Sequence, residues 1–228
     1  MCGRFTLTQT SPEALQRSFD LVAMPEDIPP SYNVAPTHQI PVVAHNAENH
    51  NALGIMQWGF VPGWAKSRAF GTRPLINARA ESAHDKPSFK RSFRRRRCLI
   101  PADGFYEWYK EDDGSSTPVY ITREDGELFA FAGLWDRWQD AESGEALLSC
   151  TILTTAANQF LSRIHHRMPV MLAPEHYDLW LSREFDDVEK LHQMLQPSED
   201  LPLDAWDVSK RVNNPSINDE GLTARPAS

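Results

Sequence analysis

Residues 127–135, ELFAFAGLW, and residues 147–154, LLSCTILT, decide the fold class of this chain. Short apolar runs bounded by turn-forming residues are typical of β-strands. Five further segments share this pattern: QIPVV at 39–43, ALGIMQW at 52–58, CLIPA at 98–102, PVYITR at 118–123 and MPVML at 168–172. The sequence therefore predicts an α+β fold that is mostly antiparallel, with a curved sheet or a partly closed β-barrel and a few short flanking helices. Glu124-Asp125-Gly126, between two of these runs, is predicted to be a hairpin turn.

Helical signals are few and short. Ser11-Pro12-Glu13 predicts the start of one helix, which would bury Leu15 and Phe19. The other two are expected from Pro174 through Tyr177 and Leu181, and from Asp186 with Val188, Leu191 and Leu195 on one face. Without repeats or linkers, residues 1–228 are expected to form a single domain, in which 213–228 is a loosely held C-terminal tail.

Composition narrows the class of protein. The chain has 228 residues, of which 41% are hydrophobic, so it can bury a real core. It shows no secretory signal and no apolar run of about 20 residues, so we expect a cytoplasmic protein without a membrane partner, nucleoid-associated when bound to DNA. Three scattered cysteines and the absence of C-x-x-C or H-E-x-x-H motifs predict reduced thiols, no metal and no cofactor. A monomer is expected.

Charge is unevenly distributed. The formal net charge is −8, but residues 86–97, KPSFKRSFRRRR, hold seven of the 23 Lys and Arg and no acidic residue. The rest of the chain therefore has 16 basic against 31 acidic residues, a pattern that suits a protein binding one polyanion in one place. The segment also fits a solvated helix end with Phe89 and Phe93 buried, and taken alone it favours that interpretation.

Cys2 is the most informative residue for chemistry. If the initiator Met is removed, Cys2 presents an α-amine and a thiol on adjacent carbons. An α-amine has a pKa of about 7.7 to 8.0, so a usable fraction is nucleophilic at neutral pH and can form a Schiff base with an aldehyde. The thiol can then close a five-membered thiazolidine ring. An alternative is an N-terminal nucleophile hydrolase, in which the thiolate attacks an amide, as in class II glutamine amidotransferases, whose MCG opening this chain resembles.

Polar residues interrupt otherwise apolar runs at several positions. Asn77 and Arg79 lie in PLINARAES, Glu107 in PADGFYEW, and His165 and Arg167 in IHHRMPVML. Each could be an ordinary surface or satisfied buried group. Together they supply the amide, carboxylate, imidazole and guanidinium groups that aldehyde chemistry needs.

Single-stranded DNA could be held by cations and aromatic rings elsewhere in the sequence. Arg4, Arg79 and Arg167 could bind phosphates. Trp58, Phe60 and Trp64 in QWGFVPGW could stack on unpaired bases. We expect Trp58 and Phe60 to be buried. Trp64, beside Pro62-Gly63, is expected to be exposed on a turn.

Seven motifs in order resemble one family, the SRAP (SOS response-associated peptidase) or abasic site processing proteins. They are MCGRF at 1–5, YNVAP at 32–36, WGFVPGW at 58–64, INAR with the following E at 76–81, PADGFYEW at 101–108, IHHRMPVML at 164–172 and VSKRVNN at 208–214. Residues 65–73 and 84–88 do not align cleanly with the family, although Lys86 is a plausible basic contact.

The resemblance implies roles for individual residues. Cys2 would be the covalent residue, Asn77 would position its amine or the sugar, Glu107 would act in ring opening, and His165, rather than His166, would be the acid/base. The implied DNA contacts are Arg4, Asn33, Pro36, Trp64, Arg79, Thr154 and Arg167. The expected function is capture of abasic sites in single-stranded DNA as a thiazolidine crosslink. The alternatives are the N-terminal nucleophile hydrolase and a noncovalent sensor of single-stranded DNA. Peptidase activity is expected only as self-removal of Met1.

Overall fold

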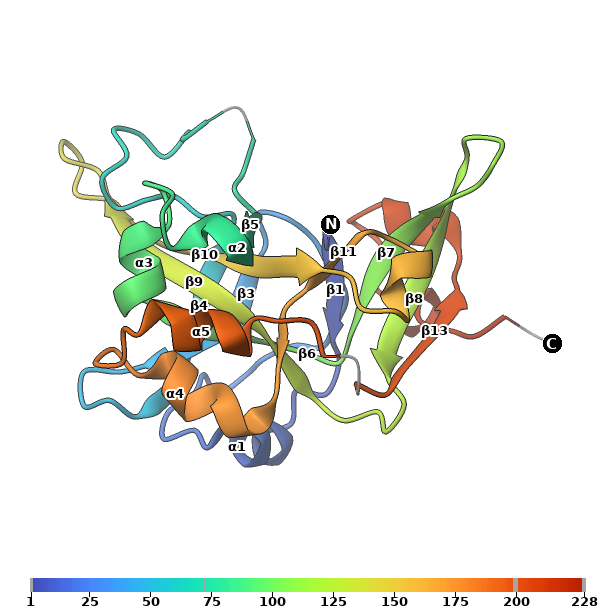
Figure 1. The fold of residues 1–228 in the computed structure, drawn as a ribbon, viewed down its shortest axis with the longest axis horizontal. Coiled ribbons are helices and arrows are strands. Elements are labelled where there is room, and N and C mark those ends of the chain that lie inside the picture. The colour runs from blue at the N-terminus through green and yellow to red at the C-terminus, as the bar shows by residue number, and fades with distance from the viewer. Residues whose placement is uncertain (1, 72, 199–200, 227–228) are drawn as a thin grey trace.

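The strands form two sheets that lie side by side in the computed structural model, which describes residues 2–71, 73–198 and 201–226 (Figure 1). Five strands close a barrel: β3 (Gln39–His45), β4 (Asn51–Trp58), β6 (Arg97–Ala102), β9 (Phe129–Gln139) and β10 (Ala146–Ala156). The ring closes because β10 pairs antiparallel with β9 and parallel with β4, where Cys150 lies beside Trp58. The predicted α+β fold with a mostly antiparallel barrel is therefore confirmed.

Short strands extend the barrel at two of its members. β5 (Asn77–Arg79) and β11 (Arg167–Pro169) both pair with β10, and β12 (Met171–Leu172) pairs with β9. The second sheet is antiparallel and has the order β13 (Leu203–Asp207), β8 (Ser116–Arg123), β7 (Gly104–Lys110), β1 (Arg4–Leu7) and β2 (Ser31–Val34). The chain's first strand is thus held between β7 and β2.

The turn at Glu124-Asp125-Gly126 corrects one expectation. The turn forms, since the Gly126 N–H donates to the Arg123 carbonyl at 3.1 Å and Gly126 has a φ of 69°, which favours glycine. However, β8 before it pairs with β7 and β13, whereas β9 after it pairs with β6, β10 and β12. The hairpin prediction is therefore wrong, because this turn links the two sheets.

The five α-helices lie away from β7, β8 and β13, whereas η3 contacts β8 (Figure 1). α1 (Pro12–Phe19) is capped by the Ser11 hydroxyl and buries Leu15 and Phe19, as predicted. The other predicted helices are η2 (Pro174–His176) leading into α4 (Tyr177–Leu181), and α5 (Val188–Met194), capped by Asp187. The remaining short helices are α2 (Ala80–Ala83), α3 (Lys90–Arg95), η1 (Leu161–Arg163), η3 (Lys210–Asn213) and η4 (Glu220–Leu222). No helix of the described ranges is long and apolar enough to span a bilayer.

The basic segment 86–97 is largely structural. Phe89, the N-cap of helix α3, and Phe93, within it, are both buried, as the helix-end interpretation requires. The Arg97 side chain is buried and donates to main-chain carbonyls of Trp180 at 2.5 Å and Phe185 at 2.7 Å. Arg96 pairs with buried Asp136, and Arg95 pairs with Asp186 at 3.1 Å. Three of the seven cations therefore hold the fold together, which leaves a smaller basic surface than the sequence suggested.

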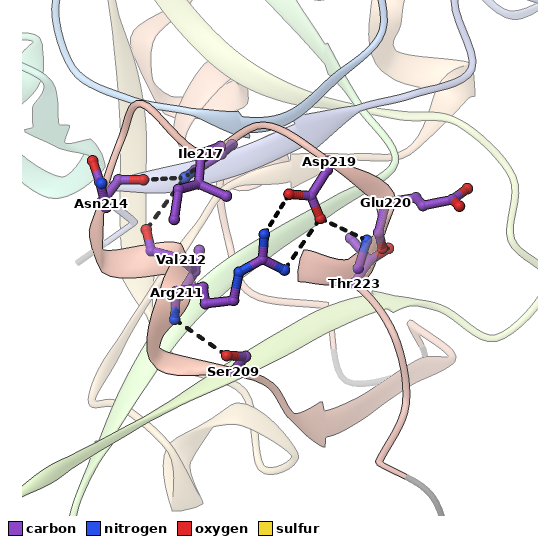
Figure 2. A network of polar contacts seen from close by, with 10 residues as sticks. Ser209, Arg211, Val212, Asn214, Ile217, Asp219, Glu220 and Thr223 are labelled. Atoms are coloured by element: carbon purple, nitrogen blue, oxygen red, sulfur yellow. Dashed lines mark hydrogen bonds and ion pairs between the residues drawn. The ribbon is translucent and has the colours of Figure 1, made fainter.

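The C-terminal segment is held firmly, against the expectation of a loose tail from Asn213. Arg211 pairs with Asp219 at 2.6 Å (Figure 2). Asn33 donates to the carbonyls of Asn214 and Ile217. Leu222 is fully buried beside Tyr106 and Tyr120. Residues 209–223, which we call the C-terminal strap, therefore cover one face of the second sheet. The polar sequence of this segment suggested a loose tail because it does not reveal the contacts that Arg4 and Asn33 make with the backbone carbonyls of the strap.

Candidate active site and nucleic-acid interface

Cys2 lies immediately before β1, at the seam between the two sheets. The pairing of Arg4 with Tyr106 and of Phe5 with Phe105 runs β1 antiparallel to β7, which carries Glu107. On the other side, the Asn77 side-chain amide on β5 donates to the Cys2 carbonyl at 2.8 Å. The antiparallel register and this hydrogen bond thus bring three of the predicted site residues together.

The Cys2 side chain is completely buried, and its Sγ contacts the Arg4 carbonyl at 3.6 Å. Burial raises the pKa of the Cys2 thiol well above its ordinary value, and the negative charge of Glu107 raises it further. Cys2 is therefore held as a neutral thiol at physiological pH. Cys98 and Cys150 are also buried, and burial raises the pKa of both thiols as it does for Cys2. Neither burial nor thiol pKa therefore separates the three cysteines, and what is particular to Cys2 is its position directly after Met1.

Glu107 is a buried carboxyl group on the inner face of the second sheet, with 3% of its surface exposed. Burial raises the pKa of Glu107 to about 7, although the backbone hydrogen bond from Trp108 opposes this shift. A carboxyl group with this pKa can both donate and accept a proton near neutral pH.

His165 lies between η1 and β11, half-buried, and its ring stacks on that of His166 with centroids 4.3 Å apart. The Arg167 N–H donates to His165 Nδ1 at 3.0 Å, which fixes the ring orientation. Burial lowers the pKa of His165, so the neutral imidazole predominates at pH 7. His166 is exposed.

Arg79, Thr154 and Arg167 are brought together by β10. Arg79 on β5 lies opposite Thr154 in the parallel pairing, and its side chain is exposed. The Arg167 guanidinium donates to the Thr154 carbonyl at 2.5 Å and forms two hydrogen bonds with Glu81, at 2.5 and 2.9 Å. These bonds lower the pKa of Glu81. Arg167 is thus engaged by the protein itself, and the buried Thr154 side chain lies beneath it.

Arg4 and Asn33 point to the C-terminal strap. Arg4 donates to the carbonyls of Val212 at 2.6 Å and Asn213 at 3.5 Å, and it also contacts the Asn33 side chain. Asn33 is 1% exposed and donates to three carbonyls of the strap. Both residues therefore tie β1 and β2 to the strap.

Trp64 projects from the molecule, as expected, with 55% of its surface exposed. The backbone before it is fixed because the Gly63 N–H donates to buried Asp136 at 2.8 Å. Phe70 packs edge-on against Trp64 with centroids 5.2 Å apart, and sequence reasoning missed this second aromatic, whose signal was a lone Phe in polar AKSRAFGTR. Pro36 is half-buried just after β2, and Trp58 and Phe60 are buried, as expected.

The site therefore combines a buried thiol, an amide and a carboxyl group where the two sheets meet, and the His165 imidazole lies between η1 and β11. The described residues include no group of three or more His, Cys, Asp or Glu side chains placed to hold a metal ion. Such a set can move protons and attack a carbonyl with its own nucleophile.

Comparisons with known proteins agree on one family. The family described as SOS response associated peptidase (SRAP) matches residues 1–215. The abasic site processing protein YoqW of Bacillus subtilis is 41% identical over 97% of this chain and 98% of its own length. The abasic site processing protein YedK of Escherichia coli is 35% identical over 83% of each chain. A crystal structure of a Bacteroides thetaiotaomicron protein matches with a TM-score of 0.84 at 26% identity, over 99% of this chain and 100% of that chain.

Proposed function

Because this chain belongs to the SRAP family, we propose that it captures abasic sites in single-stranded DNA as a thiazolidine crosslink at Cys2. The observation that supports this most directly is the grouping of Cys2, Asn77 and Glu107 where β1, β5 and β7 meet. An abasic sugar in its open form is an aldehyde, and an N-terminal cysteine is an aldehyde trap of two nucleophiles.

Removal of Met1 frees the Cys2 α-amine. The amine nitrogen attacks C1 of the open sugar, and loss of water leaves a Schiff base. The Cys2 sulfur then bonds to the imine carbon while the thiol proton passes to nitrogen, so the ring closes without an oxidant or reductant. Because its pKa is raised by burial, Cys2 enters this step as a thiol and brings the proton that the nitrogen needs.

Glu107 is suited to the step before capture. Opening the closed sugar requires removal of a proton from the C1 hydroxyl and delivery of one to the ring oxygen. A buried carboxyl group with a pKa of about 7 can do both near neutral pH. Asn77 holds the Cys2 carbonyl at 2.8 Å and so fixes the residue whose amine must meet the sugar.

The hydrolase alternative places a different demand on Cys2. Attack on an amide requires the thiolate, which arises where the thiol pKa is lowered. Burial and Glu107 raise the pKa of the Cys2 thiol in the chain that still carries Met1, whereas both functions need Met1 removed, so the two are distinguished by their products. The noncovalent sensor remains a separate alternative, since it would bind the same DNA but leave no adduct.

The test is denaturing electrophoresis of the protein mixed with single-stranded DNA carrying one abasic site, with intact-mass analysis of the same sample. We expect a 1:1 adduct on a protein lacking Met1. A Cys2→Ser variant keeps the amine, so it should give an adduct only after borohydride reduction of the Schiff base. Cys98→Ala, which removes a different buried thiol, should crosslink like wild type.

Three results would contradict the proposal. Retention of Met1 in the crosslinked species would exclude the α-amine as nucleophile. DNA binding without any adduct would favour the sensor. Glutamine or peptide amide hydrolysis that is lost in Cys2→Ala, without an adduct from wild type, would favour the hydrolase.

A further inference from the structure

A groove beside the candidate site has no role in the capture chemistry. It has a volume of about 360 Å³ and lies between η1 on one side and β7, β8 and β13 on the other. Its lining includes Tyr109, Phe160, Arg163 and Ile164. Figure 1 shows η1, in orange, beside the β7–β8 pair, on the side of the site away from α2 and α3.

The groove adjoins the site through two chain segments. Tyr109 follows Glu107 by two residues on β7, so both side chains are on the same face of that strand. Val119, at the floor of the groove, is the direct pairing partner of Glu107. On the opposite wall, Ile164 immediately precedes His165. The groove would therefore adjoin a DNA strand whose abasic sugar reacts at Glu107 and His165.

The lining has the chemistry of a site for an unpaired base. Tyr109 is 40% exposed, and the Phe160 ring has the Arg163 guanidinium above it, 5.6 Å from the ring centroid. Aromatic rings interleaved with cations are how proteins hold single-stranded nucleic acid.

We propose that this groove binds the nucleobase next to the abasic residue, stacking it on Phe160 and Tyr109 with Arg163 near the adjoining phosphate. The proposal rests on the proposed function and adds to it a base-recognition subsite. Trp64, the other exposed aromatic residue predicted to stack on a base, lies beside Pro87, whose carbonyl accepts from the Trp64 Nε1 at 3.4 Å. The bound strand would then cross the site from the Trp64 side to the η1 side.

The test uses single strands in which a tetrahydrofuran residue, which cannot react, replaces the abasic sugar. 2-Aminopurine is placed on its 5′ or its 3′ side. Wild type should quench the fluorescence at one of the two positions, because a stacked base is quenched. Phe160→Ala and Tyr109→Ala should relieve the quenching and weaken binding by about tenfold, the scale of one lost base–aromatic stack.

A substrate without the neighbouring base makes the test specific. When that nucleotide is replaced by a second tetrahydrofuran, Phe160→Ala should bind as wild type does, because the base it would contact is missing. Phe160→Leu keeps an apolar side chain without the ring and should behave as Phe160→Ala, which guards against loss of folding. Leu179→Ala, an exposed apolar residue on α4, is the matched control and should match wild type throughout.

The inference and the proposed function can fail separately. Quenching at neither position, or an equal loss of affinity for strands with and without the neighbouring base, would overturn the groove as a base site. Because these strands cannot crosslink, adduct formation with true abasic DNA is measured independently. Its absence in wild type would overturn the proposed function instead.

Discussion

Arg167 and Glu81 are joined by two hydrogen bonds, so a guanidinium predicted to bind a DNA phosphate is already paired with a carboxylate. Only 13% of the Arg167 side chain is exposed, against 51% of the Glu81 side chain. Arg79 is on β5, which like the β11 strand of Arg167 pairs with β10. Its side chain is exposed and forms no ion pair within the described part of the chain. The two arginines are therefore expected to contribute differently to DNA binding.

Arg79→Ala should reduce the slope of log affinity against log salt by about 0.7 to 1, the value of one phosphate contact. Arg167→Ala should reduce the slope less and lower the melting temperature more, because it breaks contacts with Glu81 and Thr154. Binding titrations at several salt concentrations measure both slopes. Arg17→Ala, which removes an exposed charge on α1, is the control for net charge. Equal slopes for Arg79→Ala and Arg17→Ala would show that Arg79 does not contact phosphate.

Glu107→Gln should slow crosslinking by roughly 10²-fold or more, the usual scale for a lost general acid/base. It should also stabilise the protein. The pKa of Glu107 is raised to about 7, so the folded state binds more protons than the unfolded state between about pH 4.5 and pH 7. Wild-type stability therefore falls as pH rises through that window, and the variant should lack this fall.

Urea unfolding at pH 5 and pH 8 tests the second effect. The stabilisation of Glu107→Gln over wild type should be larger at pH 8, by on the order of 1–3 kcal/mol. A variant that is less stable at pH 8 would show that the Glu107 carboxylate is well accommodated when charged. A variant that crosslinks at the wild-type rate would remove Glu107 from the mechanism.

Arg4→Ala should act through the C-terminal strap. Because Arg4 donates to the Val212 and Asn213 carbonyls, its loss should destabilise the attachment of β1 and so disorder Cys2 two residues away. We expect a lower melting temperature and slower crosslinking, with an unchanged salt slope of DNA binding. Chain truncation after Asp207, which removes the whole strap, should reproduce both effects. A reduced salt slope in Arg4→Ala would restore the sequence-based prediction that Arg4 binds phosphate.

The strands of the barrel could be predicted because the apolar runs carry their own signal, whereas β1, β2 and β13 of the second sheet were not predicted. ELFAFAGLW and LLSCTILT became β9 and β10, and every other predicted run also contains a strand. Which strands pair could not be predicted, since pairing is set by contacts between distant segments. Glu124-Asp125-Gly126 shows this limit, because its local turn chemistry is the same whether the flanking strands form a hairpin or enter different sheets.

The candidate site was predictable in part for a similar reason. Cys2, Asn77 and Glu107 were singled out by chemistry and resemblance, and the structure brings them together. Arg4, Asn33 and Arg167 were predicted to contact DNA, but their polar atoms bond to backbone carbonyls or to Glu81. A sequence shows that a side chain can bind an anion, whereas the partner that it finds depends on the tertiary structure.

His165→Ala should leave a more persistent crosslink. Reopening the thiazolidine requires a proton on the sulfur as it leaves and then addition of water to the imine, and the imidazolium can supply the proton. Burial lowers the pKa of His165, so the imidazolium becomes abundant only as pH falls below the ordinary histidine range. Wild-type crosslinks should therefore decay faster as pH falls from 7.5 to 5.5, and His165→Ala crosslinks should decay slowly with a weaker pH dependence.

The measurement is adduct decay after a chase with excess unlabelled abasic DNA, started from equal amounts of adduct. His166→Ala is the matched control, because its ring stacks on His165 but is exposed. Decay of His165→Ala adducts at the wild-type rate, or slow decay in His166→Ala instead, would assign the proton transfer to another group.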